Sequence, residues 1–94
     1  MIKSIEPSEI KNIVGTIIDI RNNNKYIEYH IPNAINIEAE KLIKEPEKYI
    51  NKNEIYYIYC QKGITSTMIC KILKIKGYNI ININGGYEKW IQEQ

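Results

Sequence analysis

The chain has 94 residues, 44% of them hydrophobic, and a formal net charge of +2, which is the composition of one ordinary globular domain spanning residues 1–94. No apolar stretch approaches the ~18 residues of a membrane-spanning helix, and the N-terminal segment lacks the apolar core of a signal peptide, so we expect a cytoplasmic protein that does not bind membranes. Lysines 71, 74 and 76 recur at helical spacing, which predicts a solvated helix face and not a nucleic-acid site.

Strand and helix patterns alternate along the chain. In chain order, the first half predicts a strand at 3–5, a short helix at 7–13, a strand at 16–20, an Asn-rich turn at 22–24, a helical turn at 25–29, a strand at 34–37, a helix at 38–43 and a helical turn at 46–50. The second half predicts a strand at 54–59, a loop at 60–65, a helix at 66–76, a strand at 79–83, a tight turn at Gly85-Gly86 and a helix at 87–92.

This alternation predicts an α/β domain with a small, mostly parallel central sheet flanked by helices on both faces. The strand at 54–59 is apolar on both faces, which indicates the central position. The helix at 66–76 has one apolar stripe that we expect to face the core, formed by Met68, Ile69, Ile72, Leu73 and Ile75.

Cys60 comes directly after the predicted central strand, at the sheet edge where α/β proteins build their sites. The short segment from Gln61 to Thr65 must curl before the next helix, and Gly63 gives the backbone the freedom to do so. A curl of this kind turns backbone N–H groups toward the strand end, so it favours a thiolate or a larger sulfur anion. The pattern alone is equally compatible with a buried, inert cysteine.

Four motifs in order give the sequence a resemblance to the rhodanese family of sulfurtransferases. They are Asp19-Ile20-Arg21, the segment from Tyr29 to Asn36, the loop from Cys60 to Ser66, and Gly85-Gly86-Tyr87-Glu88-Lys89-Trp90. These are similar to the family's D-x-R, G-H-I-P-G-A-x-N, C-x-x-G-x-R-S and G-G-x-x-x-W motifs.

The resemblance implies that Cys60 is the catalytic nucleophile, which takes sulfane sulfur from a donor as a persulfide and passes it to a thiophilic acceptor. It also implies that the surrounding loop binds substrate, through Gln61, Lys62, Gly63, Ile64, Thr65 and Ser66. Thiosulfate, cyanide, thiols and persulfides are the expected small partners, and a sulfur-relay protein is a further candidate. Thr65 and Gln61 stand where many members have Arg, so we expect poor use of thiosulfate, a dianion.

Two other functions compete with this interpretation. A Cys-dependent phosphatase or arsenate reductase would need an Arg at the far end of the loop, where this chain has Ser66. A non-catalytic interaction module of the same family is the second alternative, although such modules lack the Cys that this chain keeps.

The remaining polar residues have simpler interpretations. We expect His30 to be structural, Asp19 and Arg21 to form a buried pair, and Cys70 to fill the core. With two cysteines and one histidine far apart in sequence, we expect neither a metal site nor a cofactor.

Overall fold

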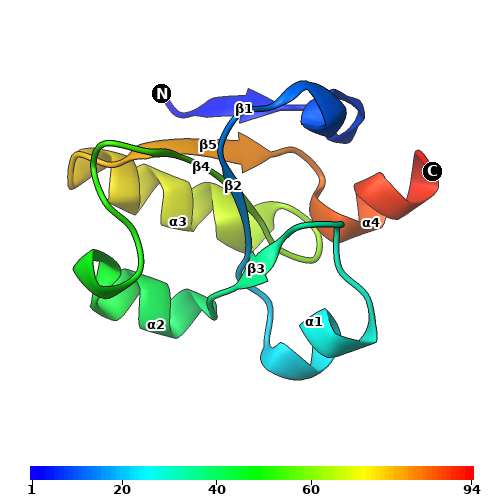
Figure 1. The fold of residues 1–94 in the computed structure, drawn as a ribbon, viewed down its shortest axis with the longest axis horizontal. Helices are drawn as coiled ribbons and strands as arrows, with labels where there is room; N and C mark the ends of the chain where they lie inside the picture. The colour runs from blue at the N-terminus through cyan, green and yellow to red at the C-terminus, as the bar shows by residue number, and fades with distance from the viewer.

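Five parallel strands form one sheet in the order β1-β5-β4-β2-β3 in the computed structural model, which describes residues 1–94 (Figure 1). The strands are β1 (Lys3–Ile5), β2 (Thr16–Asp19), β3 (Ile35–Asn36), β4 (Ile55–Tyr59) and β5 (Asn79–Ile83). All four pairings are parallel, as the alternation of strands and helices predicts. The expected central position of β4 is confirmed, because two strands lie on each side of it.

Helices cover both faces of this sheet. The helical elements are η1 (Pro7–Asn12), α1 (Asn23–Glu28), α2 (Ala39–Lys44), η2 (Pro46–Lys48), α3 (Ile64–Ile75) and α4 (Gly86–Gln92), where η marks a 3-10 helix. One apolar cluster joins the sheet to α2 and α3, and a second joins it to η1, α1 and α4. The expected fold class is therefore confirmed.

The period-two alternation of β4 assigns its side chains to the two clusters. Tyr56, Ile58 and Cys60 belong to the cluster on the α2 and α3 side, whereas Tyr57 and Tyr59 belong to the other. The strand thus directs the Cys60 side chain toward α3.

Two predicted helix starts are wrong by two residues, and both errors have a local cause. α1 begins at Asn23 because the Asn22 side chain caps it, accepting a hydrogen bond from the Lys25 N–H at 3.0 Å. α3 begins at Ile64 and not at residue 66, because Gly63 adopts a left-handed φ of 95° as the cap and turns the chain directly into the helix. The predicted loop at 60–65 therefore overlaps the first helical turn.

The predicted core stripe of α3 is partly wrong. Ile69 and Leu73 are buried as expected, but Met68, Ile72 and Ile75 are exposed to solvent. The core-facing side consists of Ser66, Ile69, Cys70 and Leu73. This helix therefore has apolar residues on two opposite sides. No helix of the structure is long and apolar enough to cross a membrane.

Candidate active site

The Cys60 thiol lies in the bend between β4 and α3, where backbone N–H groups surround the sulfur. The N–H of Gly63 donates to Sγ at 3.1 Å, and the N–H of Ser66 donates to it at 3.2 Å. Cys60 is buried, with 6% of its surface exposed. N–H donors aimed at the sulfur and the positive end of the α3 dipole interact favourably with negative charge at this position.

The Ser66 hydroxyl lies between the Cys60 sulfur and a carbonyl group of the loop. Its Oγ lies 3.3 Å from Cys60 Sγ and 3.3 Å from the Gly63 carbonyl oxygen. That carbonyl also accepts a hydrogen bond from the Thr67 hydroxyl at 2.7 Å. Because Thr67 already satisfies the carbonyl, the Ser66 proton can turn toward a thiolate without leaving a buried acceptor unpaired.

Other N–H groups of the Cys60 loop, residues 60–66, have no acceptor within the chain. They are the backbone N–H groups of Gln61, Lys62, Ile64 and Thr65. Clustered backbone donors at the start of a helix suit an anion. The loop can therefore hold a sulfur atom added to Cys60 without any cationic side chain.

The first turn of α4 contacts this loop through two backbone carbonyl groups. The Tyr87 N–H donates to the Cys60 carbonyl at 2.8 Å, and the Glu88 N–H donates to the Gln61 carbonyl at 3.0 Å. Gly86 permits this close approach, since a Cβ atom there would lie 2.4 Å from the Cys60 carbonyl oxygen. The start of α4 at Gly86 thus sets the position of the Cys60 backbone.

A buried ion pair lies behind the loop. Arg21 donates from Nη2 to the Asp19 carboxylate at 2.7 Å, and both side chains are almost fully buried. Tyr59, the last residue of β4, donates its hydroxyl to the same carboxylate at 2.7 Å. Burial and the bond to Asp19 raise the pKa of Tyr59 far above its ordinary value, which keeps that hydroxyl a donor. Burial alone would lower the pKa of Arg21, but Asp19 outweighs it and the pKa is raised.

Sequence reasoning missed that this pair reaches the Cys60 loop. Arg21 Nη1 donates to the Gln61 side-chain oxygen at 3.1 Å, and the Gln61 amide nitrogen donates to a Glu88 carboxylate oxygen at 3.2 Å. Arg21 also stacks over the Tyr87 ring, with 4.2 Å between its guanidinium carbon and the ring centroid. The Gln61 side chain therefore links the ion pair to α4, whereas its backbone N–H has no acceptor. Nothing in the sequence pattern signals a contact between residues forty positions apart.

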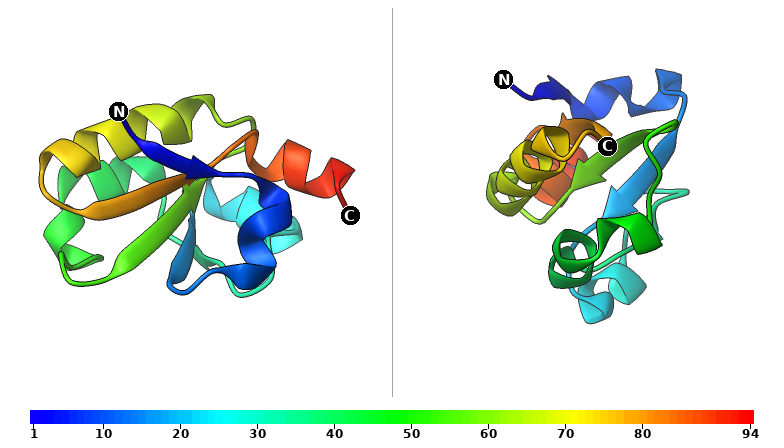
Figure 2. Two further views of the ribbon diagram at one scale, coloured as in Figure 1. Left: turned by 90° about the horizontal axis from the view of Figure 1, so that it is seen from above. Right: turned by 90° about the vertical axis from the view of Figure 1, so that its left-hand side faces the viewer.

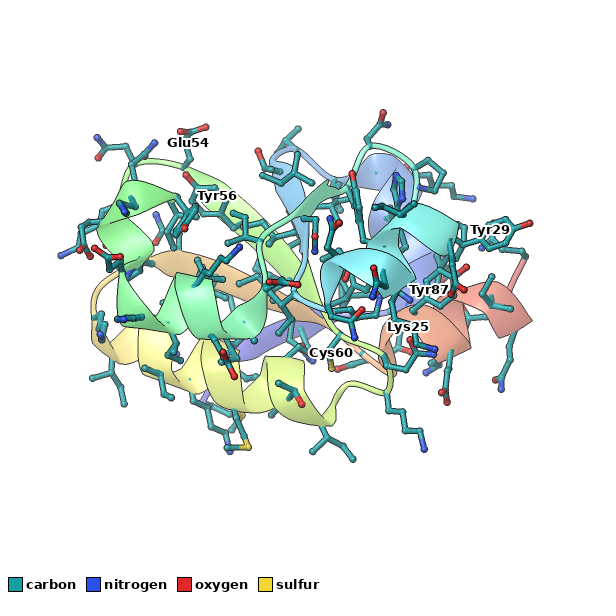
Figure 3. The ribbon with its side chains drawn as sticks, turned by 90° about the horizontal axis from the view of Figure 1, so that it is seen from below. Lys25, Tyr29, Glu54, Tyr56, Cys60 and Tyr87 are labelled. Carbon is teal, nitrogen blue, oxygen red and sulfur yellow. The ribbon has the colours of Figure 1, made fainter.

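The other residues expected at the site fall into two groups. Lys62, Ile64 and Thr65 have exposed side chains at the rim, while Gly63 and Ser66 are buried against the sulfur. Figure 3 shows Cys60 beside the first turn of α3, with Tyr87 on the neighbouring α4.

Cys70 and His30, which we expect to be structural, pack against other side chains of the fold. Burial raises the pKa of Cys70 to about 12, and its side chain shares the cluster of Cys60. His30 stacks on Tyr26 with ring centroids 3.8 Å apart. No group of three or more His, Cys, Asp or Glu side chains could hold a metal ion.

Comparison with known proteins identifies this arrangement. The sequence profile of the rhodanese-like domain matches residues 5–93, and the chain belongs to that family. Thiosulfate sulfurtransferase GlpE of Coxiella burnetii is 33% identical over 79% of this chain and 69% of its own.

Solved structures agree with the sequence match. A rhodanese-related protein from Thermoplasma volcanium superposes with a TM-score of 0.87 at 31% identity, over 97% of this chain and 92% of that one. A rhodanese-like domain protein from Staphylococcus aureus gives 0.84 at 34% identity, over 95% and 91%. The fold also occurs inside longer chains: the reduced CoADR-RHD of Bacillus anthracis gives 0.86 at 28% identity, over 95% of this chain but 16% of that one.

Proposed function

We propose that this protein is a sulfurtransferase that carries sulfane sulfur as a persulfide on Cys60. The observation that supports this most directly is the set of backbone N–H groups in the Cys60 loop, two bonded to Cys60 Sγ and four without an acceptor. The chain also belongs to a family that contains sulfurtransferases, which supports the same proposal. Two free cysteines fit work in the cytoplasm, where thiols stay reduced.

The proposed reaction has two displacements. The Cys60 thiolate attacks the outer sulfur of a donor, a bond forms between the two sulfurs, and the donor's own bond to that sulfur breaks. The leaving group, sulfite from thiosulfate or a thiolate from a persulfide, takes the electron pair. A thiophilic acceptor such as cyanide or a thiolate then attacks the outer sulfur of the Cys60 persulfide, and the Cys60 thiolate leaves. In each step one anionic nucleophile displaces another anion from the transferred sulfur, so no external oxidant is needed.

The charges near Cys60 favour a donor of low charge. Arg21 is the chain's single arginine. Its guanidinium donates hydrogen bonds to Asp19, to Gln61 and to the Tyr29 carbonyl. The Glu88 carboxylate bonds to the loop through Gln61, while Lys62 is exposed. A persulfide is therefore a better proposed donor than the thiosulfate dianion.

The same observation disfavours a phosphatase. During transfer, a phosphoryl group needs a guanidinium that can reach its oxygens. Arg21 cannot do this, because it is only 7% exposed and is hydrogen-bonded to the Gln61 side chain. The remaining alternative, an interaction module without catalysis, does not explain why four backbone N–H groups of the Cys60 loop have no acceptor within the chain.

Intact-mass spectrometry tests the proposal. After incubation with glutathione persulfide, and separately with thiosulfate, we expect the protein to gain the mass of one sulfur atom, and dithiothreitol to remove it. Cys60→Ser should abolish the gain, and Cys70→Ser should keep it. Sulfur loading that survives in Cys60→Ser, or no loading with either donor, would contradict the proposal.

A further inference from the structure

The solvent side of α3 carries an apolar stripe that has no partner in the fold. We call this set of residues the outer stripe of α3. It consists of Ile64, Met68, Ile72 and Ile75, which are 70%, 60%, 38% and 86% exposed. At 3.6 residues per turn these four positions fall within roughly 80° of one another, opposite the side that faces the core. Figure 2 shows α3 running along the outer edge of the molecule.

Positive charge borders this stripe. Lys62, Lys71, Lys74 and Lys76 lie on α3 or next to its ends, and no Asp or Glu occurs between residues 55 and 87. Four lysines exceed the net charge of +2 of the whole chain, so the remainder of the protein is acidic on balance. Lys71 is three residues from Met68 and four from Ile75, which places it at the edge of the stripe. The surface is thus both apolar and basic.

The stripe starts at the nucleophile. Ile64, its first member, follows Gly63, whose N–H bonds to Cys60 Sγ. From there the twelve residues of α3 extend about 18 Å. A chain bound along the stripe would bring one end to the Cys60 loop, as the placement of Cys60 beside the first turn of α3 indicates (Figure 3).

We propose that the outer stripe of α3 docks an acidic polypeptide with an apolar face, and that this polypeptide exchanges sulfur with Cys60. The inference rests on the proposed function and adds the class of partner. Apolar side chains would cover the stripe, and carboxylates would pair with the lysines around it. In the forward direction, the Cys60 thiolate attacks the outer sulfur of the polypeptide's persulfide, and the polypeptide's thiolate leaves with the electron pair.

Three synthetic peptides test the charge requirement. They share one amphipathic apolar face and one terminal cysteine persulfide, and their polar positions are all Glu, all Gln or all Lys. We expect the Glu peptide to load Cys60 with a KM about tenfold below that of the Lys peptide at low salt, the size of effect that one good interface residue produces. The difference should shrink as salt rises.

Two variants and two matched controls locate the contact. Met68→Glu and Lys71→Glu should each raise the KM for the Glu peptide about tenfold. Ile27→Glu on α1, at a residue 68% exposed, and Lys11→Glu on η1 make the same chemical changes away from α3 and should leave that KM unchanged. Glutathione persulfide, measured in parallel, should load all five proteins at one rate.

Each contrary result is distinct. Equal KM values for the three peptides, or equal effects of the variants and their controls, would overturn the docking surface while leaving the proposed function intact. Failure of glutathione persulfide to load the wild type would contradict the proposed function instead. Two other outcomes would refute the proposal. If the wild type sediments with anionic vesicles and Met68→Glu does not, the stripe binds a membrane. If light scattering shows a wild-type dimer that Met68→Glu dissociates, the stripe binds a second copy of the chain.

Discussion

Replacing Gly86 with alanine should disturb the active site through the backbone of Cys60. The new Cβ atom would lie 2.4 Å from the Cys60 carbonyl oxygen and 2.8 Å from that of Gln61, where separations under 3.0 Å essentially never occur. The Cys60 carbonyl must therefore retreat by about 0.6 Å, or α4 must move away. Either movement weakens the hydrogen bonds from the N–H groups of Tyr87 and Glu88.

The magnitude follows from two contributions. Gly86 has a left-handed φ of 62°, which costs an L-residue roughly 1–2 kcal/mol. Two weakened backbone hydrogen bonds, at about 0.5–1 kcal/mol each, bring the loss to about 2–4 kcal/mol. Gly77→Ala is the matched control, since its φ is 98° but its added Cβ would have only ordinary contacts, at 3.6 Å, with the Lys52 side chain. It should lose the φ contribution alone.

Urea unfolding and sulfur loading from glutathione persulfide measure the two consequences. We expect Gly86→Ala to be about 1–2 kcal/mol less stable than Gly77→Ala, and to load Cys60 at least about tenfold more slowly, because small displacements of a nucleophile are costly. Gly77→Ala should load at the wild-type rate. Equal stability of the two variants together with normal loading by Gly86→Ala would refute the idea that α4 fixes the position of Cys60.

Two further predictions concern single side chains. Iodoacetamide at neutral pH should alkylate Cys60 well before Cys70, because burial raises the pKa of Cys70 to about 12. Labelling of Cys70 should increase as the pH rises toward that value. Faster labelling of Cys70 than of Cys60 at neutral pH would contradict the assignment of Cys60 as the reactive thiol. Thr65→Arg should raise kcat/KM for thiosulfate about tenfold at most, since the added cation would stabilise the departing sulfite from an exposed position. Steady-state kinetics with glutathione persulfide as the second donor provide its control, and an unchanged thiosulfate rate would show that the N–H groups of the loop suffice.

Local patterns in the sequence were enough to predict the framework of the site. Residues 79–83 form β5 with the predicted bounds, and β4 ends one residue before Cys60, because β-branched and aromatic runs favour strands whatever surrounds them. The predicted turn at Gly85-Gly86 is displaced by one residue, since Gly85 caps α4 and Gly86 is its first residue, and both have the positive φ that a tight turn between glycines indicates. The placement of Cys60 at a strand end followed from these elements.

What the sequence could not predict depends on contacts between distant residues. Hydrophobicity alone cannot tell which of two apolar sides of α3 faces the sheet, so Met68, Ile72 and Ile75 were assigned to the core with Ile69 and Leu73. The link from Arg21 to Gln61 joins the end of β2 to the loop after β4, and it exists only because those strands are neighbours in the sheet.

These contacts divide recognition between two parts of the molecule. The buried cation nearest the loop, Arg21, is neutralised by Asp19, so the attraction for an anion at Cys60 comes from N–H dipoles, whose effect is short-ranged and directional. We propose that such a site holds one sulfur atom well but attracts a distant donor weakly. Positive charge lies instead on α3, where Lys71 borders the outer stripe and is exposed to solvent, and it acts over about a Debye length, near 8 Å at physiological salt. Under this proposal, α3 selects a macromolecular donor and the Cys60 loop carries out the sulfur exchange.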